Sequence, residues 1–282
     1  MIEKELSVMV TGASGFLGRH LLKRLEEKGF RCFGYTHGQL DITDVGAVLA
    51  EVSVLEPDIV VHCAAIASTA YANSHPEESM AVNVKGCENL ALACRRTSSK
   101  LYVMSSDQVY GGCSLDGPLS ENLTLAPNNI YGEHKLLMEG RVLDILPDAV
   151  AYRLPWMYER FNEASPHTDI VSRLTAAVQG SRPMKFSTRE YRGMTNVDTV
   201  CDNIMAGFGK IPGGVYNFGS GNALDSYSTM QKIARETGLP RELIVPDDSW
   251  GRNLSMDTSK LSGFGIVFPD TAEALVATLK GE

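Results

Sequence analysis

The sequence predicts a doubly wound α/β fold built on a parallel sheet, with a smaller α/β lobe toward the C-terminus. Three observations predict it. Strand-like and helix-like segments alternate through the first half, a glycine-rich turn joins the first strand to the first helix, and small or polar residues follow the expected strands. Such alternation favours parallel strands joined by right-handed crossovers. Ligands of these folds bind at the carboxyl ends of the strands.

The first element is a short apolar strand over residues 6–10, which runs directly into the glycine-rich turn. Apolar residues at helical spacing follow the turn as far as Gly29, so a helix is expected there. Strand, glycine turn and helix in this order are typical of a dinucleotide-binding fingerprint. The spacing is G-x-x-G-x-x-G, and the backbone N–H groups at the helix N-terminus would receive a pyrophosphate that no Cβ obstructs. The cofactor contacts expected here are Gly12, Ser14, Gly15, Phe16, Leu17 and Gly18.

The second strand, over residues 31–35, is expected to end near the adenine ribose. NAD-binding folds usually carry an acid at this place, but none occurs here before Asp41. A 2′-phosphate would therefore meet no carboxylate, and Thr36, His37 or Arg19 could contact it. NADP is favoured over NAD, with ordinary loop roles for Thr36 and His37 as the alternative. The cofactor contacts expected on this side are Thr36, Asp41 and Ile42.

Three more elements continue the alternation. Residues 58–65 indicate a buried strand that ends in Cys63, Ala64 and Ala65, whose small side chains would let the backbone approach a cofactor. A helix over residues 83–94 and a strand over 101–104 come next, and Ser105-Ser106-Asp107 closes that strand. The glycine turn and these two strand ends would meet at one edge of a parallel sheet, where the ligand is expected.

Tyr131 and Lys135 carry the chemistry. Residues four apart share one face of a helix, so the Lys135 ammonium can lie beside the Tyr131 phenol. A nearby cation favours the phenolate and lowers the pKa of a tyrosine from about 10. A phenol tuned in this way can exchange a proton with a carbonyl or carbinol. The Y-x-x-x-K spacing alone is common in helices, and it indicates such proton chemistry only together with the glycine turn.

The pattern loosens after Arg153-Leu154-Pro155. Loop-like stretches are expected over 156–194 around a helix at 169–178, followed by a strand at 215–218, a helix at 228–238 and a short helix with Asp257 as its N-cap. We predict a cofactor-binding domain over residues 1–155, to which the segment around 195–218 returns. Residues 156–194 and 219–282 would then form the substrate-binding lobe.

The composition excludes several classes of function. A net charge of −8 over 282 residues argues against non-specific binding to nucleic acid or to an anionic membrane. No apolar run has the length of a membrane span, and the N-terminal segment lacks the apolar core of a signal peptide. The six cysteines form no C-x-x-C and no metal-ligand spacing with histidine. Buried thiols in a reducing cytosol fit best, so we expect a cytoplasmic protein without a catalytic metal.

The glycine turn, Ser105-Ser106-Asp107 and Tyr131-x-x-x-Lys135 occur in an order that resembles an extended short-chain dehydrogenase/reductase of the NAD-dependent epimerase–dehydratase type. More narrowly, the chain is similar to the dTDP-4-dehydrorhamnose reductase family. The segments that carry this narrower resemblance are 57–65, 82–90, 105–110, 153–158 with its tryptophan, and the tail Met256-Asp257-Thr258-Ser259-Lys260-Leu261.

The resemblance implies a Rossmann fold and an NAD(P)H-dependent reductase of a nucleotide-linked 4-keto-6-deoxysugar. Tyr131 would protonate the ketone oxygen as hydride arrives, Lys135 would also hold the nicotinamide ribose, and Ser106 would hydrogen-bond the carbonyl oxygen. The implied substrate contacts are Ser106, Asp107, Trp156 and Arg252. Other roles stay open from the residues themselves: a strand-end cap for Ser106, a loop anchor for Asp107 and lobe packing for Trp156.

Two segments depart from the family pattern and leave the sugar open. Trp250-Gly251 stands where the family carries an R-P pair, with Arg252 one step later, and residues 67–73 lack an acidic signature. One alternative is a nucleotide-sugar epimerase or dehydratase with tightly bound NAD, although a dehydratase would need a second acid beside Asp107. Another is a non-catalytic, NADP-binding regulatory subunit. Extended members of the superfamily are often dimers, so a homodimer is the partner arrangement to consider.

Overall fold

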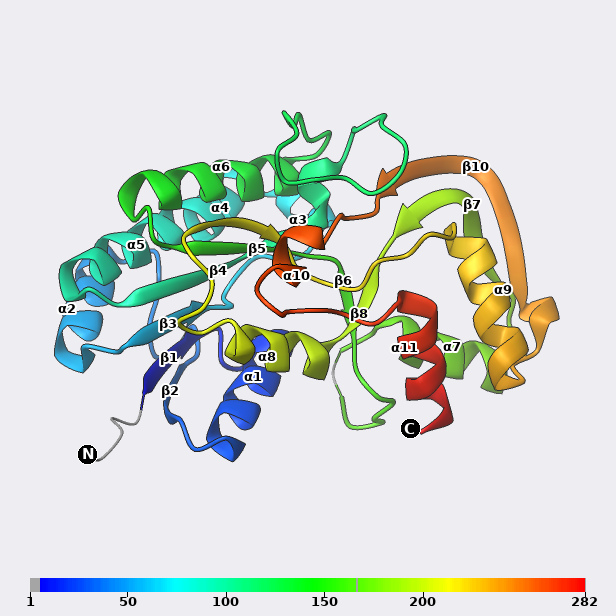
Figure 1. The fold of residues 1–282 in the computed structure, drawn as a ribbon, viewed down its shortest axis with the longest axis horizontal. Coiled ribbons are helices and arrows are strands. Elements are labelled where there is room, and N and C mark those ends of the chain that lie inside the picture. The colour runs from blue at the N-terminus through cyan, green and yellow to red at the C-terminus, as the bar shows by residue number, and fades with distance from the viewer. Residues whose placement is uncertain (1–5, 166, 282) are drawn as a thin grey trace.

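The computed structural model describes residues 6–165 and 167–281. A six-stranded sheet, in which every neighbouring pair is parallel, forms the frame of the molecule (Figure 1). The order in the sheet is β2-β1-β3-β4-β5-β9, so the chain winds first to one side of β1 and then to the other. The predicted doubly wound fold is confirmed. Its strands are β1 (Ser7–Thr11), β2 (Arg31–Tyr35), β3 (Ile59–His62), β4 (Lys100–Ser106), β5 (Val150–Leu154) and β9 (Gly214–Asn217).

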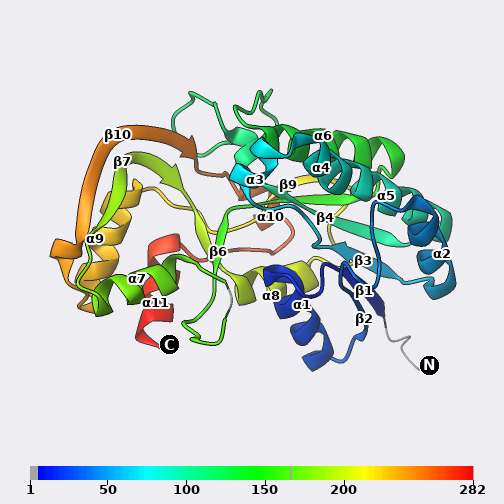
Figure 2. The ribbon, with the colours of Figure 1, turned by 180° about the vertical axis from the view of Figure 1, so that it is seen from behind.

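Alternate residues of the strands enter two hydrophobic cores, because successive side chains of a strand point to opposite faces. Val8 and Val10 belong to the core beneath α1 (Phe16–Glu27) and α8 (Val197–Ala206), whereas Met9 belongs to the core on the other face. That second core is closed by α2 (Val45–Leu55), α5 (Gly86–Thr97) and α6 (Ile130–Ile145). Figures 1 and 2 show the two helical layers on opposite faces of the sheet.

A lobe with its own core lies beside the sheet (Figure 2). It contains α7 (Ile170–Gln179), β7 (Met184–Arg192), α9 (Ser226–Thr237), β10 (Ile244–Leu254) and α11 (Thr271–Lys280). β7 and β10 pair with each other, and so do the short strands β6 (Trp156–Tyr158) and β8 (Met194–Asn196). The smaller helices are α3 (Thr69–Ser74), α4 (Pro76–Met80), a π-helical turn at Ala81–Lys85, 3₁₀ turns at Asp107–Tyr110 and Arg241–Leu243, and α10 (Ser259–Ser262).

The prediction was wrong in parts of the lobe. Loop-like stretches were expected over 156–194, but β6 and β7 lie there, and β10 was not foreseen. These strands form because each pairs with a segment far away in the sequence, which no local pattern reveals. Asp257 is also not the N-cap of α10: the helix begins at Ser259 after Thr258, although the Asp257 carboxylate accepts the Ser259 N–H at 2.9 Å.

The chain returns from the lobe to the sheet through α8 and β9. β9 pairs with β5 along Val150–Arg153, and α8 packs against α1. The division into domains at residue 155 stays a prediction. No helix in the described ranges is long and apolar enough to cross a membrane.

Candidate active site

A cavity of about 540 Å³ lies along the carboxyl ends of the sheet strands, as the doubly wound topology predicts. One wall follows β1, β3, β4 and β5, and the opposite wall comes from the lobe. The sheet side contributes Gly15, Phe16, Leu17, Cys63, Ala65, Met104, Ser106, Asp107, Tyr131, Lys135 and Leu154. The lobe side contributes Trp156, Met157, His167, Thr168, Asp169, Ile170, Arg173 and Met194.

The cavity brings the predicted catalytic residues Tyr131, Lys135 and Ser106 together with two predicted substrate contacts, Asp107 and Trp156. Part of the predicted cofactor set lines it as well, namely Gly15, Phe16, Leu17, Cys63 and Ala65. The other predicted residues are not in its lining: Gly12, Ser14, Gly18, Thr36, Asp41, Ile42, Ala64 and Arg252. Ile42 packs in the core against Gly86, and the Asp41 carboxylate accepts the backbone N–H and the hydroxyl of Thr43.

The glycine turn brings backbone against backbone. Gly12 has φ +69°, and a Cβ there would lie 2.5 Å from the Ala64 nitrogen; a Cβ on Gly18 would lie 2.1 Å from the Gly12 oxygen. Gly15, the N-cap of α1, gives the helix no side-chain cap. The first N–H groups of a helix have no intrahelical partner and attract anions. The turn therefore fits the pyrophosphate of a dinucleotide.

Tyr131 and Lys135 lie in the first turns of α6, which starts where Asn129 accepts the Gly132 N–H at 2.9 Å. Lys135 Nζ lies 5.8 Å from the centre of the Tyr131 ring and donates to the Met104 carbonyl at 2.8 Å. Burial raises the pKa of Tyr131 to about 12, while a hydrogen bond with Ser106 lowers it and the Asp107 charge raises it. Burial is the largest of these effects, so the pKa of Tyr131 is raised and not lowered as the spacing to Lys135 predicts. The phenol is protonated at neutral pH, which is the form that a proton donor needs.

Ser106 and Asp107 occupy the end of β4. The Ser106 hydroxyl accepts the Gln108 N–H at 3.2 Å, so it caps the 3₁₀ turn that follows, and it also donates to Asp107 Oδ1 at 3.3 Å. The capping role left open by the sequence is therefore present, and Ser106 lines the cavity as well. The other carboxylate oxygen of Asp107 lies 2.5 Å from Arg192 Nη2, which ties this strand end to β7 in the lobe.

Three polar residues behind the cavity wall have structural partners. The Asn83 side chain accepts the Ile66 N–H at 2.9 Å and donates to the Ile66 carbonyl at 3.0 Å. His62 Nδ1 lies 2.6 Å from the Thr11 hydroxyl, and burial, helped by the Lys135 charge, lowers its pKa to about 3. His134 Nδ1 lies 2.9 Å from the Ser79 hydroxyl. Within residues 6–165 and 167–281, no group of three or more His, Cys, Asp or Glu residues could hold a metal ion.

Arg192 is a further cation beside the cavity wall, and no sequence pattern indicated it. Its guanidinium carbon lies 3.7 Å from the centre of the Trp156 ring. Arg252, predicted as a substrate contact, pairs with Glu190 at 2.7 Å, and its role toward a substrate stays a prediction. Trp156 is 48% exposed and lines the cavity, so its side chain is not buried by packing within the lobe.

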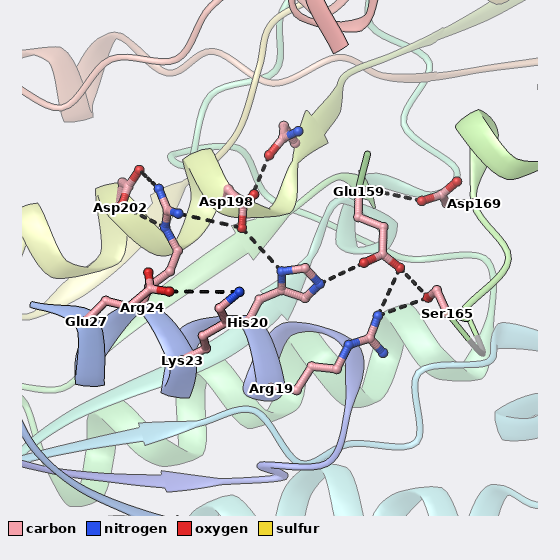
Figure 3. A network of polar contacts seen from close by, with 11 residues as sticks. Arg19, His20, Lys23, Arg24, Glu27, Glu159, Ser165, Asp169, Asp198 and Asp202 are labelled. Atoms are coloured by element: carbon pink, nitrogen blue, oxygen red, sulfur yellow. Dashed lines mark hydrogen bonds and ion pairs between the residues drawn. The ribbon is translucent and has the colours of Figure 1, made fainter. Parts of the chain in front are cut away.

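A polar network fastens the lobe segment after β6 to α1. Figure 3 shows Arg19 and His20 of α1 directed at the Glu159 carboxylate. Each lies 2.9 Å from it, and His20 also lies 3.2 Å from the Asp198 carboxylate of α8. Although burial raises the pKa of Glu159, hydrogen bonds from Ser165, His20 and Arg19 hold it below its usual range. Arg19, one of the expected contacts of a 2′-phosphate, is thus engaged by Glu159 and Ser165.

The same segment covers the glycine turn. The His167 ring stacks on Phe16 with 3.8 Å between the ring centres. No sequence signal revealed these contacts of Glu159 and His167, because their partners in α1 lie about 140 to 150 residues away in the chain. Glu139 could have been found: it follows Lys135 by four residues, as Lys135 follows Tyr131, and its carboxylate pairs with Arg153 at 2.7 Å.

Comparisons with known proteins agree with this geometry. The family model described as the RmlD substrate binding domain matches residues 6–263. A dTDP-4-dehydrorhamnose reductase of Mycolicibacterium smegmatis is 37% identical over 169 residues, which are 60% of this chain and 51% of that protein. The matched part thus spans about half the length of such relatives. The methionine adenosyltransferase 2 subunit beta of Xenopus laevis is 28% identical over 92% of this chain and 82% of its own.

Solved structures share the fold along the whole chain. The dTDP-4-dehydrorhamnose reductase of Bacillus anthracis, in complex with NADP, superposes with a TM-score of 0.88 at 20% identity and covers 100% of both chains. The UDP-glucose 4-epimerase of Thermotoga maritima superposes with a TM-score of 0.83 at 20% identity and 98% coverage of both chains. At this identity the likeness establishes the architecture alone.

Proposed function

Because this chain belongs to the family of the RmlD substrate binding domain, we propose that it is an NAD(P)H-dependent reductase of a nucleotide-linked 4-keto-6-deoxysugar. One observation carries the proposal: Ser106, Tyr131 and Lys135 line a single cavity, and Gly15, Phe16 and Leu17 of the glycine turn line it as well. A proton donor beside a dinucleotide cradle suits the reduction of a ketone to an alcohol. Relatives named dTDP-4-dehydrorhamnose reductase support the choice of substrate class.

Each residue of the cavity has a separate role in the proposed reduction. The dinucleotide, held at the glycine turn, supplies hydride when it is bound. Tyr131, kept protonated by burial, donates its proton to the ketone oxygen. When the ketone binds, the Ser106 hydroxyl turns its single hydrogen from Asp107 to the ketone oxygen and stabilises the negative charge that develops there. Lys135 provides a buried positive charge near the phenol, and the Met104 carbonyl orients its ammonium.

NADPH is the cofactor that we propose first. No acid lies between β2 and Asp41, and the Asp41 carboxylate is already bound to Thr43, so a 2′-phosphate meets little repulsion. The NADP complex of the Bacillus anthracis reductase supports the same choice. The test is the oxidation of NADPH and NADH, side by side, with enzymatically prepared dTDP-4-keto-6-deoxysugar. Turnover with NADPH is expected; no turnover of any keto-sugar in a panel, with the dinucleotide still bound, would exclude the reductase.

A second candidate is a non-catalytic subunit that binds the dinucleotide. The near full-length similarity to methionine adenosyltransferase 2 subunit beta favours it. The presence of Ser106, Tyr131 and Lys135 in one cavity speaks for the reductase, because a binding subunit has no need of a proton donor. The same assay separates the two, since only the reductase consumes NADPH.

Replacing Gly18 by alanine is expected to abolish the cradle. The new Cβ meets the Gly12 oxygen, so the turn must shift, and stability falls by about 1–3 kcal/mol. The dinucleotide Kd should rise by about tenfold or more, since the pyrophosphate depends on close backbone approach. Titration calorimetry and thermal unfolding measure both effects. Gly221→Ala is the matched control, because nothing lies within 4 Å of a Cβ added there and the residue is outside the cavity lining; equal dinucleotide affinity in the two variants would contradict the assignment.

A further inference from the structure

Arg192 is a buried cation held between the two walls of the cavity. It is 1% exposed and ends β7. One edge of its guanidinium pairs with Asp107, which lies beside Ser106 on the sheet side, and its face lies over the ring of Trp156 on the lobe side. A planar guanidinium can do both at once, whereas an ammonium offers no flat face.

The other guanidinium atoms of Arg192 do not make the hydrogen bonds that would offset the cost of burying its charge. Its Nε and Nη1 have no hydrogen-bond partner among the described residues, and its second carboxylate neighbour, Glu190, lies 3.8 Å from Nη1. Glu190 is itself shared with Arg252 and with the Ser226 hydroxyl. Burying a charge with incomplete hydrogen bonding opposes stability. The two contacts that Arg192 does complete are the ones to residues that line the cavity.

We propose that Arg192 is a positioning residue for the reaction in this cavity. It sets the orientation of the Trp156 ring and of the Asp107 carboxylate together, and through Asp107 that of the Ser106 hydroxyl, which donates to it. Its effect on turnover rests on the proposed reductase function. A sugar ring held against Trp156 would thereby keep one orientation relative to the hydroxyl groups of Ser106 and Tyr131.

Tryptophan fluorescence tests the positioning without any substrate. The chain has two tryptophans, and Trp250 does not line the cavity. In a Trp250→Phe background, Trp156 is therefore the sole reporter. Arg192→Lys keeps the positive charge near Asp107 but removes the flat face. The acrylamide quenching constant of Trp156 is expected to rise by about twofold as the ring is released, with a matching fall in anisotropy. Arg189→Lys, an exposed change on the same strand, should leave both unchanged.

Kinetics test the consequence. Arg192→Lys is expected to lower kcat/KM for the keto-sugar by about tenfold, mainly by raising KM. A tenfold loss corresponds to the energy of a lost buried cation–π contact. The Kd for NADPH should stay within about twofold, because the cradle is not touched. Trp156→Leu should cause a similar loss, and the double variant should lose little more, since both changes break the same contact. Trp156→Leu changes a half-exposed residue, so it remains informative if Arg192→Lys does not fold.

Failure of the positioning role and failure of the reductase proposal give different results. Unchanged quenching in Arg192→Lys, or losses of kcat/KM that multiply in the double variant, would overturn the positioning role. If the Trp250→Phe parent reduces no keto-sugar while it still binds NADPH, the reductase proposal fails. The quenching difference between Arg192→Lys and Arg189→Lys then still decides whether Arg192 orients Trp156.

Discussion

Replacing Tyr131 by phenylalanine is expected to lower kcat for keto-sugar reduction by about 10²–10⁴-fold, the usual contribution of a positioned proton donor. Among Ser106, Tyr131 and Lys135, which all line the cavity, Tyr131 has the uncharged group that is acidic enough to give up a proton. Phenylalanine keeps the ring, so packing changes little and the hydride path is preserved. Steady-state oxidation of NADPH, with the dinucleotide Kd measured in parallel, gives the result.

The dinucleotide Kd of Tyr131→Phe should lie close to that of the wild type. Tyr191→Phe is the matched control, because it removes a hydroxyl from an exposed tyrosine outside the cavity lining. Full reductase activity in Tyr131→Phe would mean that another group delivers the proton, and the roles assigned to this cavity would have to change. Equal losses in both variants would point to a general effect of hydroxyl removal.

Replacing Arg153 by methionine is expected to destabilise the fold by about 3–5 kcal/mol, the cost of leaving a buried partner charge uncompensated. Arg153 and Glu139 have side chains that are each 4% exposed, and two hydrogen bonds, at 2.9 and 2.7 Å, join them. Arg153 also donates to the Tyr110 hydroxyl at 2.8 Å, and that hydroxyl donates to Asn217 at 2.8 Å. Urea unfolding measures the loss.

Two further variants sharpen this result. Asp148→Asn removes one charge of the Lys100–Asp148 pair, and because Asp148 is 70% exposed the change should cost less than about 1 kcal/mol. The double variant Glu139→Leu with Arg153→Met removes both buried charges and should recover much of the loss. A loss from Arg153→Met no larger than that from Asp148→Asn would show that the buried pair does not stabilise the fold. Since Glu139 shares a helix face with Tyr131 and Lys135, the single variant should also lower activity.

Much of the nucleotide-binding half could be predicted because its signals are local. The turn from Gly12 to Gly18 follows a strand and opens a helix within one short stretch, and the four-residue spacing of Tyr131 and Lys135 places both on one face of α6. The same α/β alternation predicts the edge of the sheet at which the cavity lies. By contrast, the pKa of Tyr131 depends on burial, which sequence spacing does not reveal.

The sequence by itself determined the α/β alternation of the first half, the glycine cradle and the pair on α6, since each depends on neighbours within a few residues. Only the tertiary structure decided which lobe residues face that pair. β7 meets β10, Glu159 meets Arg19, and Arg192 meets Asp107 across 85 residues of chain. Such contacts follow from how whole elements pack, and a buried charge takes whichever partner that packing brings within reach.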